Sequence, residues 1–487
     1  MLLTACTAVT DDTGVVVPEV SKRFINLSIA VTNSNGTITR GTPSGGENGD
    51  GREAGFAREN AVTGITLMLY QDANGINTTA NPVIDFVAYY PVSRSGNPAT
   101  AGTSYTEKTA EAIYQTGNQL VPHNTIDFTK TYRAIVVANA DLTGSITAGT
   151  SHLNDLRNMT LDKIYSGDET KPAVSCGNFV MSSEQDQTLS FAAVSASQDA
   201  AGDYYYDLTT QPLVIERMAA RIDFWAVNGT YDADKAGYVY HVGETSDRFV
   251  VTGIMPFNLN NGTSIAETNF GKEYLLKRLT AGLSTITPQW LVDETTSNYV
   301  LDPQTVGKQG TAAHPSLTNS LESVKDLSAV AFAQSGYYKS IAAMYGVIAS
   351  GGGYASLTDG SLTGEDVIVA YPMENTLLPE SPLYYNATGI AIEGYYYSGG
   401  LTDTAPERRV YYGFLRHQGE GDSYDIETTN DTEEISHTGT AMNVGIVRNN
   451  IYRIWIGSIT PDIVAPKVTL KIKVKKWDQF THDVIYM

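Results

Sequence analysis

The sequence predicts a mainly β protein built from two sandwich-like domains in series. The chain has 487 residues, which is long for one domain and sufficient for two. Its composition, 10% aromatic with 30 Tyr and 44 Gly but only 17% charged, is typical of many short strands joined by turns. Short segments in which apolar residues alternate with polar ones recur along the sequence and end at Gly, Asn or Asp.

The first half opens with an alternating segment, Lys22 to Val31, that is predicted to be a half-buried strand. Its apolar residues lie at every second position: Ile25, Leu27, Ile29 and Val31. A spacer poor in apolar residues follows, over 41–60. Further strands are predicted at 65–70, 83–90, 131–138, 178–181, 204–206 and 213–225. The domain boundary is placed at residue 210, which gives a tether at 1–21, an N-terminal domain at 22–209 and a C-terminal domain at 210–487.

The second half repeats this pattern, with one short helical insertion. Strands are predicted at 238–242, 249–254, 367–371, 389–397, 410–416 and 451–459. Apolar residues at three- and four-residue spacing predict the insertion, which should pack on the second domain: Leu317, Leu321, Val324, Leu327, Ala331, Ile341, Met344 and Tyr345.

The last twenty residues contain another alternating segment. Its apolar residues are Val468, Leu470, Ile472 and Val474, and Trp477 follows them. This tail is predicted to be a strand, either donated to a neighbouring molecule or closing its own domain; a sufficiently long tail could do both.

The N-terminus and the overall charge limit where the protein acts and what it binds. Leu3-Thr4-Ala5-Cys6 fits a lipobox, so Cys6 is predicted to be acylated, any membrane attachment to be through lipid alone, and the protein to be surface-tethered or periplasmic. A formal charge of −21 argues against nucleic acid as a partner, because phosphate backbones would be repelled. With only two cysteines, no disulfide framework is expected.

No catalytic, cofactor or metal site is predicted, and the chain is not expected to be an enzyme. The seven histidines are scattered singly, and the HExxH, G-x-S-x-G and P-loop motifs are absent. A glycosidase is less readily excluded, because its two carboxylates need not be close in sequence. Cys176 is interpreted as a packed or loop residue. The tyrosine runs 204–206 and 395–397 are interpreted as strand residues alternating between core and surface rather than as sugar-stacking platforms.

Several short motifs together resemble the fimbrillin family of Bacteroidales type V pili. The C-terminal half carries Tyr-Pro-Met-Glu-Asn-Thr-Leu at 371–377, Val-Arg-Asn-Asn-Ile-Tyr-Arg-Ile at 447–454 and Lys-Lys-Trp at 475–477. Ile-Glu-Arg at 215–217 and Ala-Ala-Arg-Ile at 219–222 resemble the inter-domain segment of that family. Each motif is short, but their order and spacing extend the resemblance over most of the chain.

The resemblance implies two transthyretin-like β-sandwich domains in a lipoprotein carried to the outer surface. It implies that an arginine-specific protease removes the N-terminal strand and that subunits then join by strand exchange into an extracellular fimbria. The Arg40–Gly41 bond is the preferred cleavage site, and Arg52 and Arg58 are alternatives. The partners implied are other copies of this chain or related pilus subunits. A stalk subunit is the first interpretation; a tip or accessory adhesin, or a monomeric lipid-anchored glycan-binding protein, is the alternative.

Overall fold

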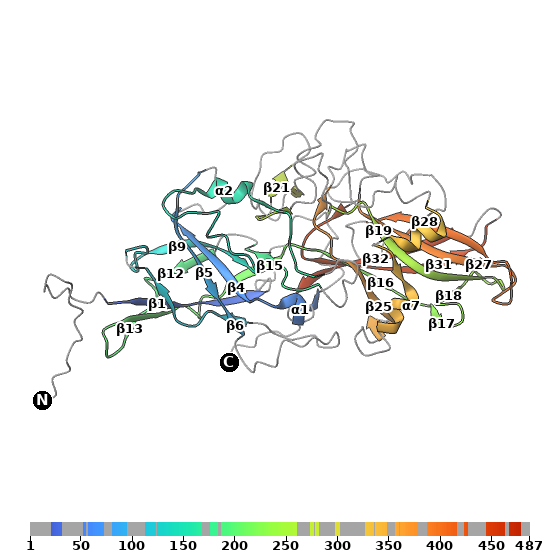
Figure 1. Ribbon diagram of the computed structural model, residues 1–487, viewed down its shortest axis with the longest axis horizontal. Helices are drawn as coiled ribbons and strands as arrows, with labels where there is room; N and C mark the ends of the chain where they lie inside the picture. Colours follow the sequence, from blue (N-terminus) through green and yellow to red (C-terminus); the bar gives the residue numbers. More distant parts are fainter. Residues whose placement is uncertain are drawn as a thin grey trace, which may run out of the picture.

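The protein is mainly β, and its sheets form two groups placed end to end in an elongated molecule (Figure 1). The computed structural model describes residues 21–31, 52–54, 57–72, 80–94, 113–122, 124–167, 176–183, 187–260, 273–276, 278–281, 298–301, 327–335, 337–347, 356–359, 361–376, 387–415, 423–426, 445–462 and 467–478. Within these residues, no helix is long and apolar enough to cross a membrane.

The first group contains one large and one small sheet. The large sheet has the order β5 (Ile84–Pro91), β4 (Gly64–Tyr70), β9 (Thr131–Ala138), β11 (Met181–Ser182), β15 (Leu213–Arg217), β2 (Ser28–Val31), β7 (Ile113–Gln115) and β6 (Ser93–Arg94), and β12 (Gln187–Ser190) also pairs with β9. The small sheet has the order β13 (Ser197–Gln198), β14 (Tyr204–Asp207), β1 (Arg23–Asn26) and β8 (Gln119–Val121).

The second group also contains two main sheets. One has the order β24 (Ser356–Asp359), β25 (Leu362–Ala370), β16 (Arg221–Trp225), β31 (Asn450–Thr460), β32 (Lys467–Asp478) and β29 (Ser423–Ile426), with β3 (Arg52–Ala54) added beside β32. The other has the order β17 (Thr230–Asp232), β18 (Gly237–His241), β19 (Arg248–Phe257), β27 (Gly389–Tyr397) and β28 (Glu407–Phe414), with β23 (Lys339–Ser340) beside β19.

Short pairs and helices complete the description. The pairs are β10 (Thr160–Leu161) with β20 (Glu273–Tyr274), β21 (Arg278–Ala281) with β22 (Asn298–Leu301), and β26 (Asn375–Thr376) with β30 (Gly445–Ile446). The helices are α1 (Ala57–Asn60), α2 (Leu153–Asn158), α6 (Ala329–Gln334) and α7 (Ile341–Val347). Helices α6 and α7 fall in the predicted helical insertion, whose earlier part, 317–326, lies outside the described residues. Phe332 of α6 packs on Met255, Phe257 and Ala391, and Ile341 of α7 joins the second core.

Two large hydrophobic cores follow the two groups of sheets. The first consists mainly of residues up to Ala219 and the second begins at Ala220. The segment 213–225, predicted as one strand, is therefore two. The backbone N–H of Met218 donates to Val180 O at 3.0 Å in the first group, whereas that of Ala220 donates to Pro372 O at 3.0 Å in the second. The ladder is interrupted because the chain passes from one core to the other here.

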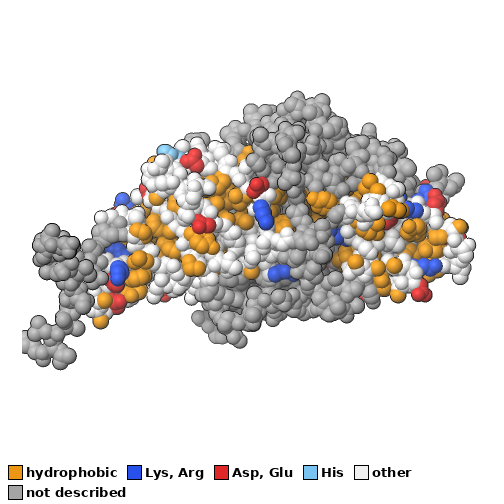
Figure 2. Space-filling view, in the orientation of Figure 1, with side chains coloured by type: hydrophobic (Ala, Val, Ile, Leu, Met, Phe, Trp, Pro, Cys, Tyr) orange, Lys and Arg blue, Asp and Glu red, His pale blue; other side chains and the backbone are white. Residues whose placement is uncertain are grey.

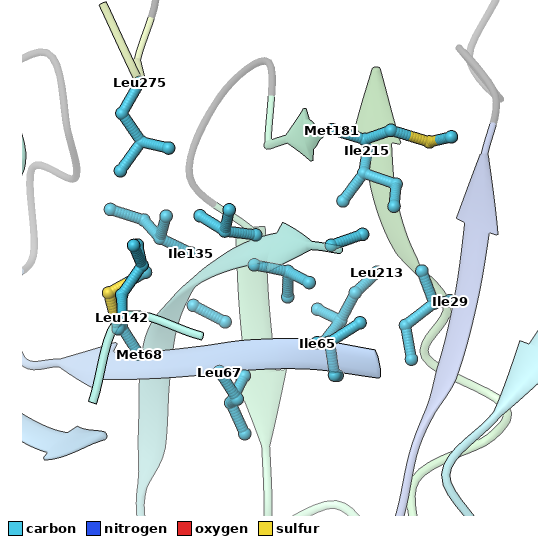
Figure 3. Packing of buried hydrophobic residues seen from close by; sticks show 14 of the residues in the cluster. Ile29, Ile65, Leu67, Met68, Ile135, Leu142, Met181, Leu213, Ile215 and Leu275 are labelled. Atoms are coloured by element: carbon cyan, nitrogen blue, oxygen red, sulfur yellow. The ribbon is translucent and has the colours of Figure 1, made fainter. Parts of the chain in front are cut away.

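Residues from the second half of the chain also pack in the first core. Leu275 and Leu276 follow β20, and both are buried in the first core together with Tyr371 and Ile451. Figure 3 shows Leu275 pointing toward the cluster that contains Met68, Ile135 and Leu142. On the face seen in Figure 2, the hydrophobic side chains of the described residues are scattered among polar ones over both groups, and no single large apolar patch stands out.

Candidate functional site

Residues 23–31 occupy an interior position in two sheets of the first group. In the small sheet, β1 lies between β14, which it pairs in parallel, and β8, which it pairs antiparallel. In the large sheet, β2 lies between β15, again parallel, and β7, again antiparallel. One extended segment therefore fills a gap between two continuous stretches of chain, 113–121 and 204–217. We call the four flanking strands β7, β8, β14 and β15 the strand site.

The predicted core face of this segment is buried. Ile25, Leu27 and Ile29 each have 0% exposed surface and belong to the first core. Figure 3 shows the side chain of Ile29 directed toward Leu213 and Ile65. Val31, the fourth predicted member of this face, is paired with Ile215 through its backbone, but its side chain lies outside the described part.

Thr116 holds the segment where it crosses from the small sheet to the large one. At Leu27 both flanking chains leave the ladder, one between β7 and β8 and the other between β14 and β15. The Leu27 N–H donates to Thr116 Oγ1 at 3.0 Å, and the Thr116 N–H donates to the Leu27 carbonyl at 3.1 Å. Thr116 is only 5% exposed, so water has little access to this position. The two bonds to Thr116 therefore satisfy the Leu27 backbone groups that regular strand pairing would otherwise satisfy.

Aromatic contacts fix the other face of β1. The ring of Phe24 stacks on that of Tyr205 with centroids 4.9 Å apart and planes 8° apart. The Tyr205 hydroxyl donates to Asp199 Oδ2 at 2.9 Å, and this hydrogen bond orients the Tyr205 ring. On the core face, the Arg23 guanidinium lies 4.9 Å from the centroid of the Phe128 ring. The segment is thus recognised on both of its faces.

The structure separates the three candidate cleavage sites. Arg52 lies in β3, which pairs in parallel with residues 476–478 of β32. Arg58 lies in α1, and its guanidinium donates to Cys176 O at 3.1 Å and to the Tyr371 hydroxyl at 2.9 Å. A protease needs an extended substrate segment that is free to enter its cleft, whereas Arg52 is paired in a sheet and Arg58 lies in a helix. Arg40 and Gly41, like Cys6, lie outside the described residues.

A buried chain of alternating charges joins α1 to the second group. Glu59 pairs with Arg221 at 3.2 Å, Arg221 with Asp223 at 2.7 Å, Asp223 with Arg453 at 3.2 Å, and Arg453 with Asp366 at 2.7 Å; all five side chains have no exposed surface. Because α1 (Ala57–Asn60) forms the end of the spacer 41–60, this network anchors the chain where the link to residues 23–31 ends.

Burial shifts the titration of two groups in this network. Loss of hydration raises the pKa of Asp223 to about 7, because the attraction of Arg221 and Arg453 is offset in part by the nearby Asp366 carboxylate. Loss of hydration also raises the pKa of Tyr371 well above its ordinary value, and the Tyr371 hydroxyl stays protonated and donates to Glu59.

The predicted donor residues serve their own domain in this structure. Strand β32 pairs with β31 at residues 467–476 and with β29 at residues 468–471. Val468, Leu470 and Ile472 have 0% exposed surface and lie in the second core. The alternative of a final strand of the chain's own domain describes what is seen. Donating these side chains would first require β32 to leave its sheet. Val474 and Trp477 lie in β32, but their side chains are outside the described part.

Other residues singled out from the sequence have structural surroundings. Cys176 is buried, with 0% exposed surface, as its packed interpretation predicted. Tyr205 and Tyr206 point to different surroundings, Tyr205 to Phe24 and Tyr206 to the Phe128 ring in the core region. Among the described side chains, no group of three or more His, Cys, Asp and Glu could hold a metal ion.

Sequence reasoning missed Thr116 and Glu59. A threonine at the end of a short strand and a glutamate in a four-residue helix carry no recognisable pattern. Their partners, Leu27 and Arg221, lie 89 and 162 residues away. The one available signal was the prediction of residues 22–31 as a strand, because an interior strand that crosses between sheets needs a partner at the crossing.

Comparison with solved structures finds resemblances over nearly the whole chain. A candidate cell adhesion protein from Parabacteroides distasonis is 13% identical, with 95% of this chain and 98% of that chain covered and a TM-score of 0.41. A fimbrilin from Porphyromonas gingivalis is 14% identical, with 95% and 99% covered and a TM-score of 0.36. The tip fimbrial protein Mfa3 from the same species, truncated at its C-terminus, is 8% identical, with 94% and 99% covered and a TM-score of 0.34. No protein-family model and no curated protein sequence matches the chain.

Proposed function

We propose that this chain is a structural pilus subunit that assembles after proteolysis by exchange of its N-terminal strand, and so supports adhesion from the cell surface. The observation that carries the proposal is the interior position of residues 23–31, which residues 32–51, with Arg40 among them, join to the rest of the chain. In this proposal, 22–209 and 210–487 are transthyretin-like domains, and acylated Cys6 tethers the precursor to outer-membrane lipid.

Removal of the segment would leave a site that another strand can fill. The core would lose three fully buried apolar side chains, Ile25, Leu27 and Ile29, each of which contributes roughly 1.5–3 kcal/mol of burial free energy. Backbone groups of β7, β8, β14 and β15 would lose their partners at the same time. An incoming strand with alternating apolar side chains satisfies both needs, as in other cases of strand addition.

The anchoring of residues 52–60 favours Arg40 as the processing site. The β3–β32 pairing and the Glu59–Arg221 ion pair hold the second half of the spacer, so a cut at Arg40 leaves the two groups of sheets joined as before. A cut at Arg58 would instead divide α1 and separate the Arg58 contacts with Cys176 and Tyr371 from the contacts of Glu59. The arginine-specific protease of this proposal therefore acts between the strand and β3.

The proposal is tested on surface extracts of producing cells, run unheated on a denaturing gel and analysed by mass spectrometry of the N-terminus. The wild-type chain should occur in large assemblies whose subunits begin at Gly41. Arg40→Ala should remain a lipid-modified monomer, whereas the matched variant Arg52→Ala should assemble normally. Assemblies whose subunits still carry acylated Cys6 would refute strand removal as the trigger.

The burial of β32 favours a second candidate, a tip or accessory adhesin that accepts a strand without donating one. Val468, Leu470 and Ile472 already lie in the second core, and β31 and β29 flank their strand. A stalk subunit must both accept and donate. Deletion of residues 479–487 separates the two roles: loss of all assemblies supports a stalk subunit, and unchanged incorporation supports a terminal one.

A further inference from the structure

The alternation of apolar residues alone does not determine the register of a strand in the strand site. Ile25, Leu27 and Ile29 are all apolar and fully buried, so a shift of two residues would again place apolar side chains in the core. Only a shift of one residue would turn them to the opposite face. Thr116 bonds to backbone groups that every residue except proline carries, so it strengthens the crossing without selecting a register.

The side chains between the apolar ones do distinguish registers. Phe24 stacks on Tyr205, whose hydroxyl is held by Asp199, so position 24 favours an aromatic ring. Ser28 is only 3% exposed although it faces away from the apolar set, so position 28 admits a small side chain and excludes a charged one. The site therefore reads six consecutive positions, 24 to 29, as aromatic, apolar, any residue, apolar, small and apolar.

The C-terminal end of this chain does not carry that pattern. Aligning Val468, Leu470 and Ile472 with positions 25, 27 and 29 places Lys467 at position 24 and Lys471 at position 28. Moving the alignment by two residues places Thr469 and Lys473 there instead, and reversing the strand places Lys473 or Lys475 at position 24. In 479–487, no three apolar residues stand at alternate positions, in either direction.

We infer that the strand site accepts a strand from a different subunit, one whose sequence runs aromatic, apolar, any residue, apolar, small, apolar. This inference rests on the proposed function and narrows it: once cleavage at Arg40 has removed residues 22–31, the C-terminal end of a second copy of this chain is excluded as the donor. Tyr205 and the enclosure of Ser28 determine the specificity, and Thr116 anchors whichever strand is accepted.

Peptide exchange tests the inference. The full-length protein is cut at Arg40 with an arginine-specific protease, and fluorescent peptides are added in excess to replace the retained fragment; binding is followed by anisotropy. The peptide of residues 21–31 should bind, and its Lys22→Ala form, altered at an exposed position, should bind equally. Phe24→Lys should weaken binding about threefold to tenfold, and Ser28→Lys more than about a hundredfold, because it buries an unpaired charge.

Peptides of residues 467–474 and 479–487 decide between the two sources of the strand. Both should bind far more weakly than the peptide of residues 21–31. Equal binding of either one would overturn the inference, as would unchanged binding of the Ser28→Lys and Phe24→Lys peptides. In Tyr205→Ala protein, the preference for the unaltered peptide over its Phe24→Lys form should disappear. If even the peptide of residues 21–31 fails to exchange, the strand cannot be replaced, and the proposed function itself is wrong.

Discussion

Leu27→Ala should loosen the N-terminal strand strongly once the chain is cut at Arg40. Leu27 has 0% exposed surface, lies at the crossing between the two sheets, and belongs to the first core. Truncating such a leucine typically costs about 2–5 kcal/mol, because apolar burial is lost and a cavity remains. Since every 1.4 kcal/mol is a factor of ten, retention of the cut fragment should fall about 30-fold to about 3,000-fold.

The assay compares wild type, Leu27→Ala and the exposed control Lys22→Ala after complete cleavage at Arg40. Gel filtration followed by mass spectrometry gives the share of the N-terminal fragment that stays with the body, measured at several dilutions. Lys22→Ala should behave as wild type. Equal retention of the fragment in all three proteins would refute the reasoning, because the buried side chain would then contribute nothing to strand binding.

Three further predictions concern helix α1 at the end of the spacer and the charge network. Glu59→Gln should lower the free energy of unfolding by about 3–5 kcal/mol in urea titrations, since Arg221 loses a buried ion pair. The control variant Glu244→Gln, at an exposed position, should change it by less than about 0.5 kcal/mol. Equal effects of the two variants would count against a stabilising role of the network. Burial raises the pKa of Asp223 to about 7. Between about pH 4 and pH 7, this carboxyl is therefore protonated in the folded protein but ionised in the unfolded chain. The stability contributed by this group is therefore present below pH 4 and lost as the pH rises through 7. The free energy of unfolding should accordingly fall more steeply from pH 5 to 8 in wild type than in Asp223→Asn. Parallel curves of unfolding free energy against pH for the two proteins would contradict this. Limited digestion by an arginine-specific protease under native conditions should leave the bond after Arg58 intact until urea unfolds α1, and early cleavage there would show that its contacts with Cys176 and Tyr371 do not protect it.

The local pattern of apolar and polar residues was enough to predict the mainly β fold class and many individual strands. Residues 65–70, 131–138, 389–397 and 451–459 alternate or contain β-branched and aromatic residues in short runs, and all four lie in observed strands. The alternation at 25, 27 and 29 likewise predicted which side chains of the first segment are buried. These features depend on neighbours within a few residues, and the sequence displays them directly.

Where the sequence was ambiguous, contacts between distant residues determined where a strand ends and which sheet it joins. Residues 213–225 look like one strand but divide at 218–220, because the strands on either side join different cores. The tail at 468–472 looks equally suited to donation and to its own sheet, and only pairing with β31 and β29 places it inside the second core.

By itself, the sequence determined that residues 22–31 form a strand with one apolar face, because alternation is a property of neighbouring residues. Only the tertiary structure decided that this strand crosses between two sheets, that Thr116 hydrogen-bonds its backbone at the crossing, and that Glu59 anchors the end of the spacer. These outcomes depend on which distant groups must share buried surroundings, and no short stretch of sequence encodes that choice.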